Sequence, residues 1–209
     1  MPEQACPSKI TTVLLDRDGT VIIDKNYLSD PAGVELLPGA AEGLHQFSHA
    51  GLRLFIVTNQ SGIGRGYFTE ADYHSCHDAL VRLLFSHGVT LAGSAFCPHA
   101  PEEACNCRKP SLGMWQALAS QYGFVPMQTV MIGDKAEDIV FGRTAGVAEA
   151  ILVLTGKGAE TATRLRLPLP EQGAVFCPVV DAIHDVTLPH AVAKDLAGAA
   201  AYILGLEAP

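Results

Sequence analysis

Two carboxylates at the end of an apolar segment are the residues in this sequence best suited to chemistry. Asp16 and Asp18 follow the apolar run 10–15, which mixes β-branched residues with leucine and shows no polar alternation. Such a run is typical of a strand covered on both faces of a parallel sheet, and these sheets bind ligands where their strands end. Gly19 lets the chain turn sharply there. Because two carboxylates so close together repel each other unless a cation lies between them, the pair predicts a hard, oxygen-binding metal such as Mg2+.

A second polar group stands at the end of another apolar run, 53–58, where Thr58 is followed by the polar residues 59–61. A threonine hydroxyl and the backbone N–H groups after it can hold phosphate oxygens. Ordinary turns have a similar composition, but the position of this group after Asp16 favours the phosphate role. Arg65 follows in a glycine-rich stretch, where it either reaches a distal phosphate or is simply solvated, and the sequence leaves both readings open.

Four potential metal ligands lie close together in the sequence: Cys97, His99, Cys105 and Cys107. Three thiols and one imidazole are the nitrogen and sulfur ligands that a tetrahedral Zn2+ prefers. With all four positions filled no site is left for water, so the cluster predicts a structural zinc that holds a loop. A reduced cysteine cluster without metal is the alternative. Cys6, Cys76 and Cys177 have no such neighbours and are expected to be inert.

The predicted zinc loop runs directly into Arg108, Lys109 and Pro110. A bound metal would fix the exit of the loop, and Pro110 would stiffen the chain that follows. The planar guanidinium of Arg108 suits bidentate recognition of phosphate, whereas Lys109 is a compact charge suited to the oxygens of a transferring group. A pair of solvated cations is the alternative.

A third acidic group follows the apolar run 129–132, where Asp134 and Lys135 come after a glycine. Asp134 would supply the metal with a further carboxylate. Asp138 lies where a helix begins, and carboxylates are favoured by the dipole at that end. We expect Asp138 to be a hydrogen-bond partner of the site and Asp134 to be the ligand.

Strand-like and helix-like segments alternate along the chain, which predicts a parallel sheet flanked by helices in a Rossmann-like, three-layer αβα sandwich. Strands are expected at 10–15, 53–58, 129–132 and 151–154, with a last one near 174–180. Helices are expected at 39–50, 69–87, 112–122, from 136 onward, and at 189–206. The length predicts a single domain over 1–209, with a zinc loop at 97–110 and a C-terminal extension at 159–209 of uncertain packing.

Composition narrows the class of function. The formal net charge of -8 argues against a surface for nucleic acid or anionic membrane. Five of the 14 Lys and Arg residues nevertheless lie in or beside the motifs: Arg17, Arg65, Arg108, Lys109 and Lys135. No signal peptide is evident, and the longest apolar stretch, 196–206, is shorter than the ~20 residues that span a bilayer. We therefore expect a cytoplasmic protein with reduced thiols.

These motifs, in this order, resemble those of the haloacid dehalogenase superfamily of phosphatases, and in particular its zinc-loop subfamily, over about 11–158. The resemblance implies a fold without a large cap domain. It implies that Asp16 is the nucleophile and Asp18 the general acid and later base. It further implies that Thr58 and Lys109 steady the phosphoryl group. Mg2+ would be held by Asp16, the Asp18 carbonyl and Asp134.

Within that subfamily the chain resembles the phosphatases that remove the 7-phosphate of D-glycero-D-manno-heptose 1,7-bisphosphate. The partner implied is a small phosphorylated sugar, with no nucleic acid or membrane, bound by a monomer or weak homodimer. The substrate-binding residues implied are Asp24, Lys25, Asn26, Tyr27, Asn59, Gln60, Ser61, Arg65, Arg108 and Lys135.

Three alternatives remain at this stage. Histidinol-phosphate phosphatases with a zinc loop share the spacing between His99 and Cys105, although Arg65 and the motif at 133–135 favour the heptose enzymes. A zinc-stabilised binding module without turnover is disfavoured, since a binder needs no nucleophile such as Asp16. A polynucleotide 3′-phosphatase is disfavoured by the acidic charge and the absence of a basic stripe.

Overall fold

The computed structural model describes residues 9–180, 182 and 185–206, which contain one seven-stranded sheet in the order β3-β2-β1-β4-β5-β7-β6. The strands are β1 (Thr12–Leu15), β2 (Arg53–Asn59), β3 (Gly93–Cys97), β4 (Thr129–Gly133), β5 (Glu149–Val153), β6 (Phe176–Pro178) and β7 (Ala191–Ala193). All neighbouring strands are parallel except β6, which is antiparallel to β7. This confirms the mainly parallel sheet predicted from the sequence.

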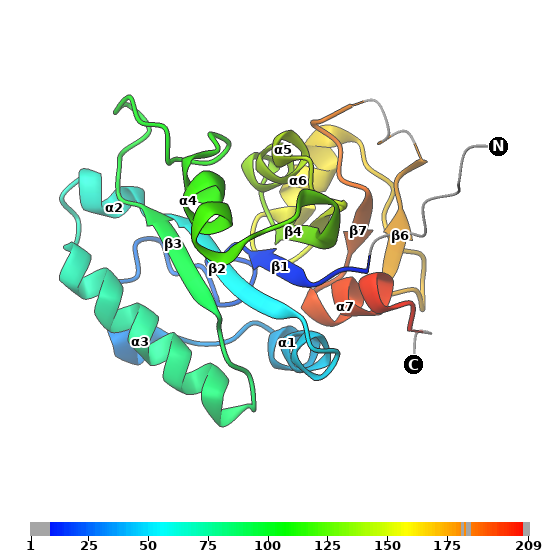
Figure 1. Cartoon of the computed structure of the whole chain (residues 1–209), viewed down its shortest axis with the longest axis horizontal. Coiled ribbons are helices and arrows are strands. Elements are labelled where there is room, and N and C mark those ends of the chain that lie inside the picture. The colour runs from blue at the N-terminus through cyan, green and yellow to red at the C-terminus, as the bar shows by residue number, and fades with distance from the viewer. Residues whose placement is uncertain (1–8, 181, 183–184, 207–209) are drawn as a thin grey trace.

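Helices cover both faces of the sheet (Figure 1). They are α1 (Ala40–His49), α2 (Ser61–Gly64), α3 (Glu70–Ser86), α4 (Gly113–Tyr122), α5 (Ala136–Ala145), α6 (Gly158–Leu165) and α7 (Leu196–Leu204), with short 3-10 turns at Pro31–Gly33 and Pro126–Gln128. One buried cluster joins α1, α3 and α7 to the sheet, and a second joins α4, α5 and α6 to its other face. The molecule is thus the predicted three-layer sandwich.

The first strand shows why its sequence lacks polar alternation. Val13 and Leu15 belong to one buried cluster and Leu14 to the other, and all three side chains are fully buried. Strand β1 is paired with β2 on one side and with β4 on the other. The residues that follow it therefore emerge between the ends of two neighbouring parallel strands, which is the position required for a shared site.

Local signals set several helix ends as predicted. Thr69 begins α3 with a capping box, because its hydroxyl accepts from the Asp72 N–H and the Asp72 carboxylate accepts from the Thr69 N–H. Gly123 ends α4 in the left-handed conformation, with φ of 67°. Both features match the boundaries expected from the sequence to within a residue or two.

The C-terminal part of the sequence differs from the prediction. The helix expected at 189–206 starts only at Leu196, because Ala191–Ala193 forms β7, pairs with β5 and is fully buried. Asp195 marks the boundary, since its carboxylate accepts from the Gly198 N–H and caps α7. Strand β6 confirms the strand expected near 174–180. Small apolar residues fit a buried strand as well as a helix, so their periodicity alone could not separate the two.

Three further elements were not anticipated. Ser61–Gly64 forms the short helix α2, where a flexible turn was expected, and β3 and α6 lie in stretches given no element. Among the described residues no helix is both long and apolar enough to cross a membrane. Cys6, expected to be inert, lies outside the described residues.

Candidate active site

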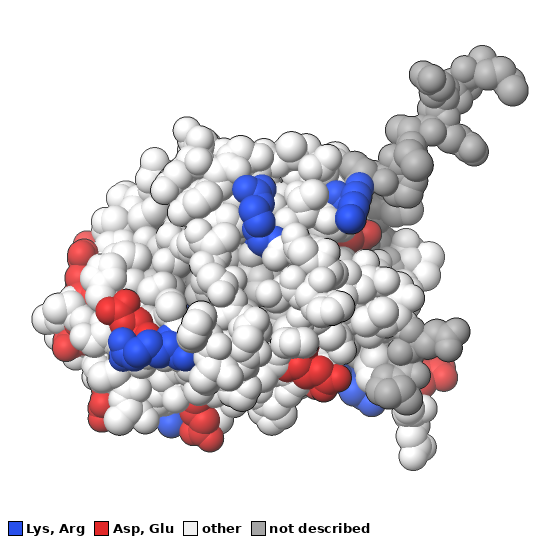
Figure 2. All heavy atoms as spheres, turned by 60° about the horizontal axis from the view of Figure 1, so that its bottom comes forward, with Lys and Arg blue, Asp and Glu red and all other residues white. Residues whose placement is uncertain are grey.

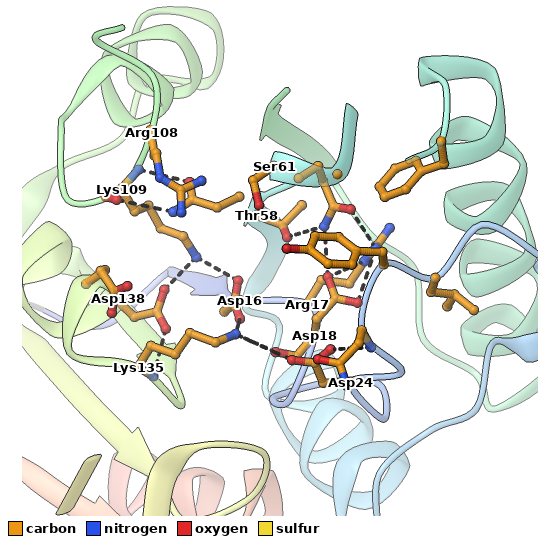
Figure 3. A pocket seen from close by; sticks show the side chains of 18 residues that line it. Asp16, Arg17, Asp18, Asp24, Thr58, Ser61, Arg108, Lys109, Lys135 and Asp138 are labelled. Atoms are coloured by element: carbon orange, nitrogen blue, oxygen red, sulfur yellow. Dashed lines mark hydrogen bonds and ion pairs between the residues drawn. The ribbon is translucent and has the colours of Figure 1, made fainter. Parts of the chain in front are cut away.

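A pocket of about 260 Å³ opens at the carboxyl ends of the central strands (Figure 3). Most of the predicted site residues line it: Asp16, Asp18, Asp24, Asn26, Tyr27, Thr58, Asn59, Gln60, Ser61, Arg108, Lys109 and Lys135. Lys25 and Arg65 do not, and Asp134 lies fully buried at its base. The pocket also has an apolar wall of Leu28 and Phe68, which no sequence signal distinguished from ordinary core residues.

Lys109 is the centre of the site. Its Nζ lies 2.7 Å from Asp16 Oδ1, 2.5 Å from Asp138 Oδ1 and 2.7 Å from the Val57 carbonyl oxygen, so all three ammonium protons have acceptors. Burial would lower the pKa of Lys109, but Asp138 and Asp16 outweigh it and raise the pKa. The lysine is therefore a fixed positive charge next to the first carboxylate.

Asp16 is held in its ionised form although it is buried. Burial would raise the pKa of its carboxyl, but Lys109 and Lys135 outweigh that effect and lower the pKa. Figure 3 shows both ammonium groups turned toward this carboxylate. A carboxylate that stays ionised in a largely dehydrated site is suited to act as a nucleophile.

Several oxygen atoms at the base of the pocket face a common point. Asp16 Oδ2 and Asp134 Oδ1 are buried and, among the described residues, lack a hydrogen-bond partner. Lys135 Nζ lies 3.8 Å and 3.5 Å from these two atoms and 3.2 Å from the Asp18 carbonyl oxygen. Because buried carboxylate oxygens need a donor or a cation, these residues fit a hard metal ion.

The other oxygens of the acidic group are already occupied. Asp134 Oδ2 accepts from the Lys157 N–H at 2.7 Å. Two glycines leave room for this oxygen, since a Cβ on Gly19, which has φ of 92°, or on Gly156 would lie 2.3 Å from it. Asp138 Oδ1 contacts Lys109, and its Oδ2 accepts from the Lys135 N–H at 3.0 Å. This geometry agrees with Asp134 as a ligand and Asp138 as a partner of the lysines.

Two amide side chains face protein groups. Asn59 Oδ1 accepts from the Lys109 N–H at 2.9 Å, and its Nδ2 donates to the Lys109 carbonyl at 3.2 Å. Gln60 Nε2 donates to Asp18 Oδ2 and to Thr58 Oγ1, each at 2.8 Å. Asn59 thus fixes the backbone that carries Lys109, while Gln60 links the two polar groups that follow β1 and β2.

The rim of the pocket is built from three loops. Arg65 donates to the Tyr27 hydroxyl at 2.9 Å and pairs with Glu102 at 3.5 Å, and the Tyr67 ring lies edge-on to Tyr27 at 4.7 Å. Arg65 therefore braces the rim in this structure. Lys25 is turned outward and pairs with Glu35 at 3.1 Å.

The Cys/His cluster lies at the end of β3 and in the segment before α4. The four potential ligand atoms of Cys97, His99, Cys105 and Cys107 lie within 4.8 Å of one another. The Sγ atoms of Cys97 and Cys105 are 3.7 Å apart, close to the roughly 3.8 Å expected for two thiolates on one tetrahedral Zn2+. The cluster is thus capable of holding a metal and leads directly to Arg108.

Fold and site together define a HAD-like hydrolase. The HAD-hydrolase-like family model matches residues 106–199. The chain is 41% identical over 152 residues, 69% of its length, to the D-glycero-beta-D-manno-heptose-1,7-bisphosphate 7-phosphatase of Haemophilus ducreyi, covering 84% of that protein. It is 37% identical to the enzyme of the same name from Vibrio cholerae, covering 85% of this chain and 94% of that one.

The chain therefore belongs to the family of heptose-1,7-bisphosphate 7-phosphatases. A solved structure of a D,D-heptose 1,7-bisphosphate phosphatase from B. bronchiseptica, complexed with magnesium and phosphate, superimposes with a TM-score of 0.76 at 28% identity. That superposition covers 95% of this chain and 100% of the other. The family resemblance drawn from the sequence motifs is confirmed.

Proposed function

We propose that this chain hydrolyses the 7-phosphate of D-glycero-D-manno-heptose 1,7-bisphosphate through a covalent aspartyl-phosphate. The observation that carries the proposal is the buried Asp16 carboxylate in the pocket, whose Oδ1 lies 2.7 Å from Lys109 Nζ. The names of the relatives support the substrate. Arg108 and Lys135 add two further cations to the pocket lining, as a bisphosphate requires.

The chemistry divides into two displacements at phosphorus. Asp16 attacks, its oxygen bonds to phosphorus, and the bond from phosphorus to the sugar oxygen breaks while Asp18 gives that oxygen a proton. Asp18 then takes a proton from water, the water oxygen bonds to phosphorus, and the bond to Asp16 breaks. Lys109 and Thr58 hold the phosphoryl oxygens throughout.

The metal proposal is Mg2+ held by Asp16, the Asp18 carbonyl and Asp134. The two buried oxygens without hydrogen-bond partners support it. When bound, the ion would neutralise charge on the transferring phosphoryl group. Its presence would also keep Asp134 ionised, although burial and the Asp16 charge raise the pKa of Asp134 to about 7.

We expect Mg2+ to stabilise the protein more at about pH 8 than at about pH 5. The raised pKa of Asp134 means that, without metal, its contribution to stability is complete below the unfolded pKa near 3.8 and is lost as the pH rises through about 7. Mg2+ binds the ionised form, so its effect grows over the same range. Melting temperatures with Mg2+ and with EDTA across this range check the prediction, and equal differences at both pH values would contradict it.

Substrate preference tests the function directly. We expect a much larger kcat/KM for the heptose 1,7-bisphosphate than for histidinol phosphate, with Asp16→Asn as the blank. Histidinol phosphate carries an amine where the bisphosphate has its second anion, and Arg108 and Lys135 repel a cation. A preference for histidinol phosphate would instead assign the chain to the histidinol-phosphate phosphatases. If neither compound were turned over, a binding module without activity would be favoured.

We further propose that the Cys/His cluster binds a structural Zn2+. Replacing Cys107 by serine is expected to remove the metal and to lower kcat by about 10- to 100-fold, because Cys107 immediately precedes the segment that carries Arg108 and Lys109. Zinc content and kcat are measured on the same samples. Cys177→Ser, outside the cluster, is the matched control. Full activity without zinc would contradict the proposal.

The remaining alternative substrate is a polynucleotide end. Figure 2 shows the basic residues of one face as separate spots beside acidic ones, in agreement with a net charge of -8. That pattern supports a small phosphorylated sugar as the partner. We further propose that the protein acts in the cytoplasm as a monomer or weak homodimer. Salt-sensitive binding of DNA would argue against this assignment.

A further inference from the structure

A ring of hydrogen bonds surrounds the carboxylate of Asp18. Arg17 donates from Nε to Asp18 Oδ2 at 3.0 Å and from one terminal nitrogen to Asp18 Oδ1 at 3.2 Å. Gln60 Nε2 donates to Asp18 Oδ2 at 2.8 Å. The same terminal nitrogen of Arg17 donates to Gln60 Oε1 at 3.0 Å, which closes the ring. Figure 3 shows Arg17 and Asp18 on the side of the pocket opposite Lys109.

The ring is buried. Arg17 is 1% exposed and Gln60 is 5% exposed, and the Arg17 guanidinium lies 5.2 Å from the centre of the Tyr73 ring. Burying a guanidinium is costly unless it is paired, and an apolar residue often stabilises such a position equally well. Arg17 is therefore better explained by what it does to Asp18 than by stability.

Each polar atom of the Gln60 amide already has a protein partner. Its two N–H groups are directed to Asp18 and Thr58, and its oxygen accepts from Arg17. The planar fork of Arg17 fixes both oxygens of the Asp18 carboxylate in one plane, which a lysine at this position could not do. Both residues thus act on Asp18 through directed contacts.

We propose that Arg17 and Gln60 are positioning residues that set the orientation of the acid/base Asp18, an inference that rests on the proposed function. Oδ2 accepts two of the bonds, from Arg17 and Gln60, whereas Oδ1 accepts one. Oδ1 keeps the free lone pair, so it is the atom that gives the proton to the sugar oxygen and later takes one from water. Gln60 links this orientation to Thr58 on the neighbouring strand.

Two variants test this clamp, by which we mean the hydrogen bonds that Arg17 and Gln60 make with Asp18 and with each other. Gln60→Met keeps the volume and removes the donors, and Arg17→Lys keeps the charge and removes the fork while leaving the Gln60–Thr58 contact in place. Each is expected to lower kcat by about 10- to 100-fold, since small errors in placing a reacting group have effects of this size. KM for the bisphosphate should change by less than about threefold, because on this proposal both residues act through Asp18 and not on the substrate.

Combining each variant with Asp18→Asn distinguishes a role that acts through Asp18 from a purely structural one. A purely structural defect would lower kcat by the same factor whether or not Asp18 is present. Once Asp18 cannot transfer a proton, Gln60→Met and Arg17→Lys should cause little further loss of kcat. Thr129→Val is the control for stability, because it removes a buried hydrogen bond to the Val125 carbonyl outside the pocket. It should lower the melting temperature without lowering kcat.

The possible outcomes distinguish failure of the proposed function from failure of the positioning role of Arg17 and Gln60. If Asp18→Asn alone retains wild-type kcat, the proposed role of Asp18 fails. If Asp18→Asn is impaired but either clamp variant keeps wild-type kcat, or loses the same factor in the Asp18→Asn background, the clamp is overturned and the proposed function stands. A rise in KM with unchanged kcat for Gln60→Met would instead make Gln60 a substrate-binding residue.

Discussion

Replacing Asp16 by asparagine is expected to lower kcat by at least about 10⁴-fold, because without the nucleophile the covalent route is closed. Asparagine has nearly the same shape, but its amide oxygen cannot form the aspartyl-phosphate. Lys109 would keep its contacts with Asp138 and the Val57 carbonyl, so the loop that carries it should stay in place. Phosphate release and the melting temperature are the two measurements.

The fold should be unaffected or slightly stabilised by this change. Asp16 contributes to the raised pKa of Asp134, and removing its charge relieves repulsion between two buried carboxylates. Asp24→Asn is the matched control, since it makes the same change on the pocket lining and should mainly alter KM. Retention of more than about one hundredth of wild-type kcat by Asp16→Asn would be incompatible with covalent catalysis at this residue.

The intermediate itself can be sought in the Asp18→Asn variant. With an aryl phosphate, whose leaving group needs no proton, the loss of Asp18 should slow only the second displacement, and phosphorylated protein should accumulate. Mass spectrometry of acid-quenched samples should then locate one phosphoryl group on the peptide that contains Asp16. The same experiment on Asp16→Asn should give no modified peptide.

The sequence was sufficient to place Asp16, Thr58 and Asp134 at one edge because the strands before them have no polar face. A run that is apolar at every position must be covered on both sides, which implies a parallel sheet and strand ends that meet. The Cys/His cluster could be found because ligand type and spacing are themselves the signal. Both inferences need only the order and type of the residues in the sequence.

The direction of the side chains at those strand ends could not be predicted from the sequence. Asn59 and Gln60 were predicted to bind substrate, and both line the pocket. Their side-chain amides contact Lys109 and Asp18, which are distant in the chain, and the sequence did not predict these contacts. Arg65 likewise contacts Tyr27 from a separate loop. An amide or guanidinium is equally able to bind substrate or backbone, so only the packing of these segments could distinguish the two.

Replacing Lys109 by methionine is expected to lower kcat by about 10²- to 10³-fold and to destabilise the protein by about 3–5 kcal/mol. Lys109 contacts both Asp16 and Asp138, which are almost fully buried, and methionine would remove the only ammonium group that the structure places in contact with both carboxylates among the described residues. Urea unfolding and phosphate release measure the two effects. Lys135→Met, whose side chain is 33% exposed, should destabilise much less and mainly raise KM.

Adding Asp138→Asn to Lys109→Met should separate the two roles of the lysine. The second change removes one of the two carboxylates that have lost their cation, so part of the lost stability should return. Activity should not return, because the double variant still lacks the Lys109 ammonium, which stabilises the charge that develops on the phosphoryl oxygens. Recovery of kcat together with stability would mean that Lys109 acts only on the fold, and the assignment of its ammonium to the transferring phosphoryl group would have to be abandoned.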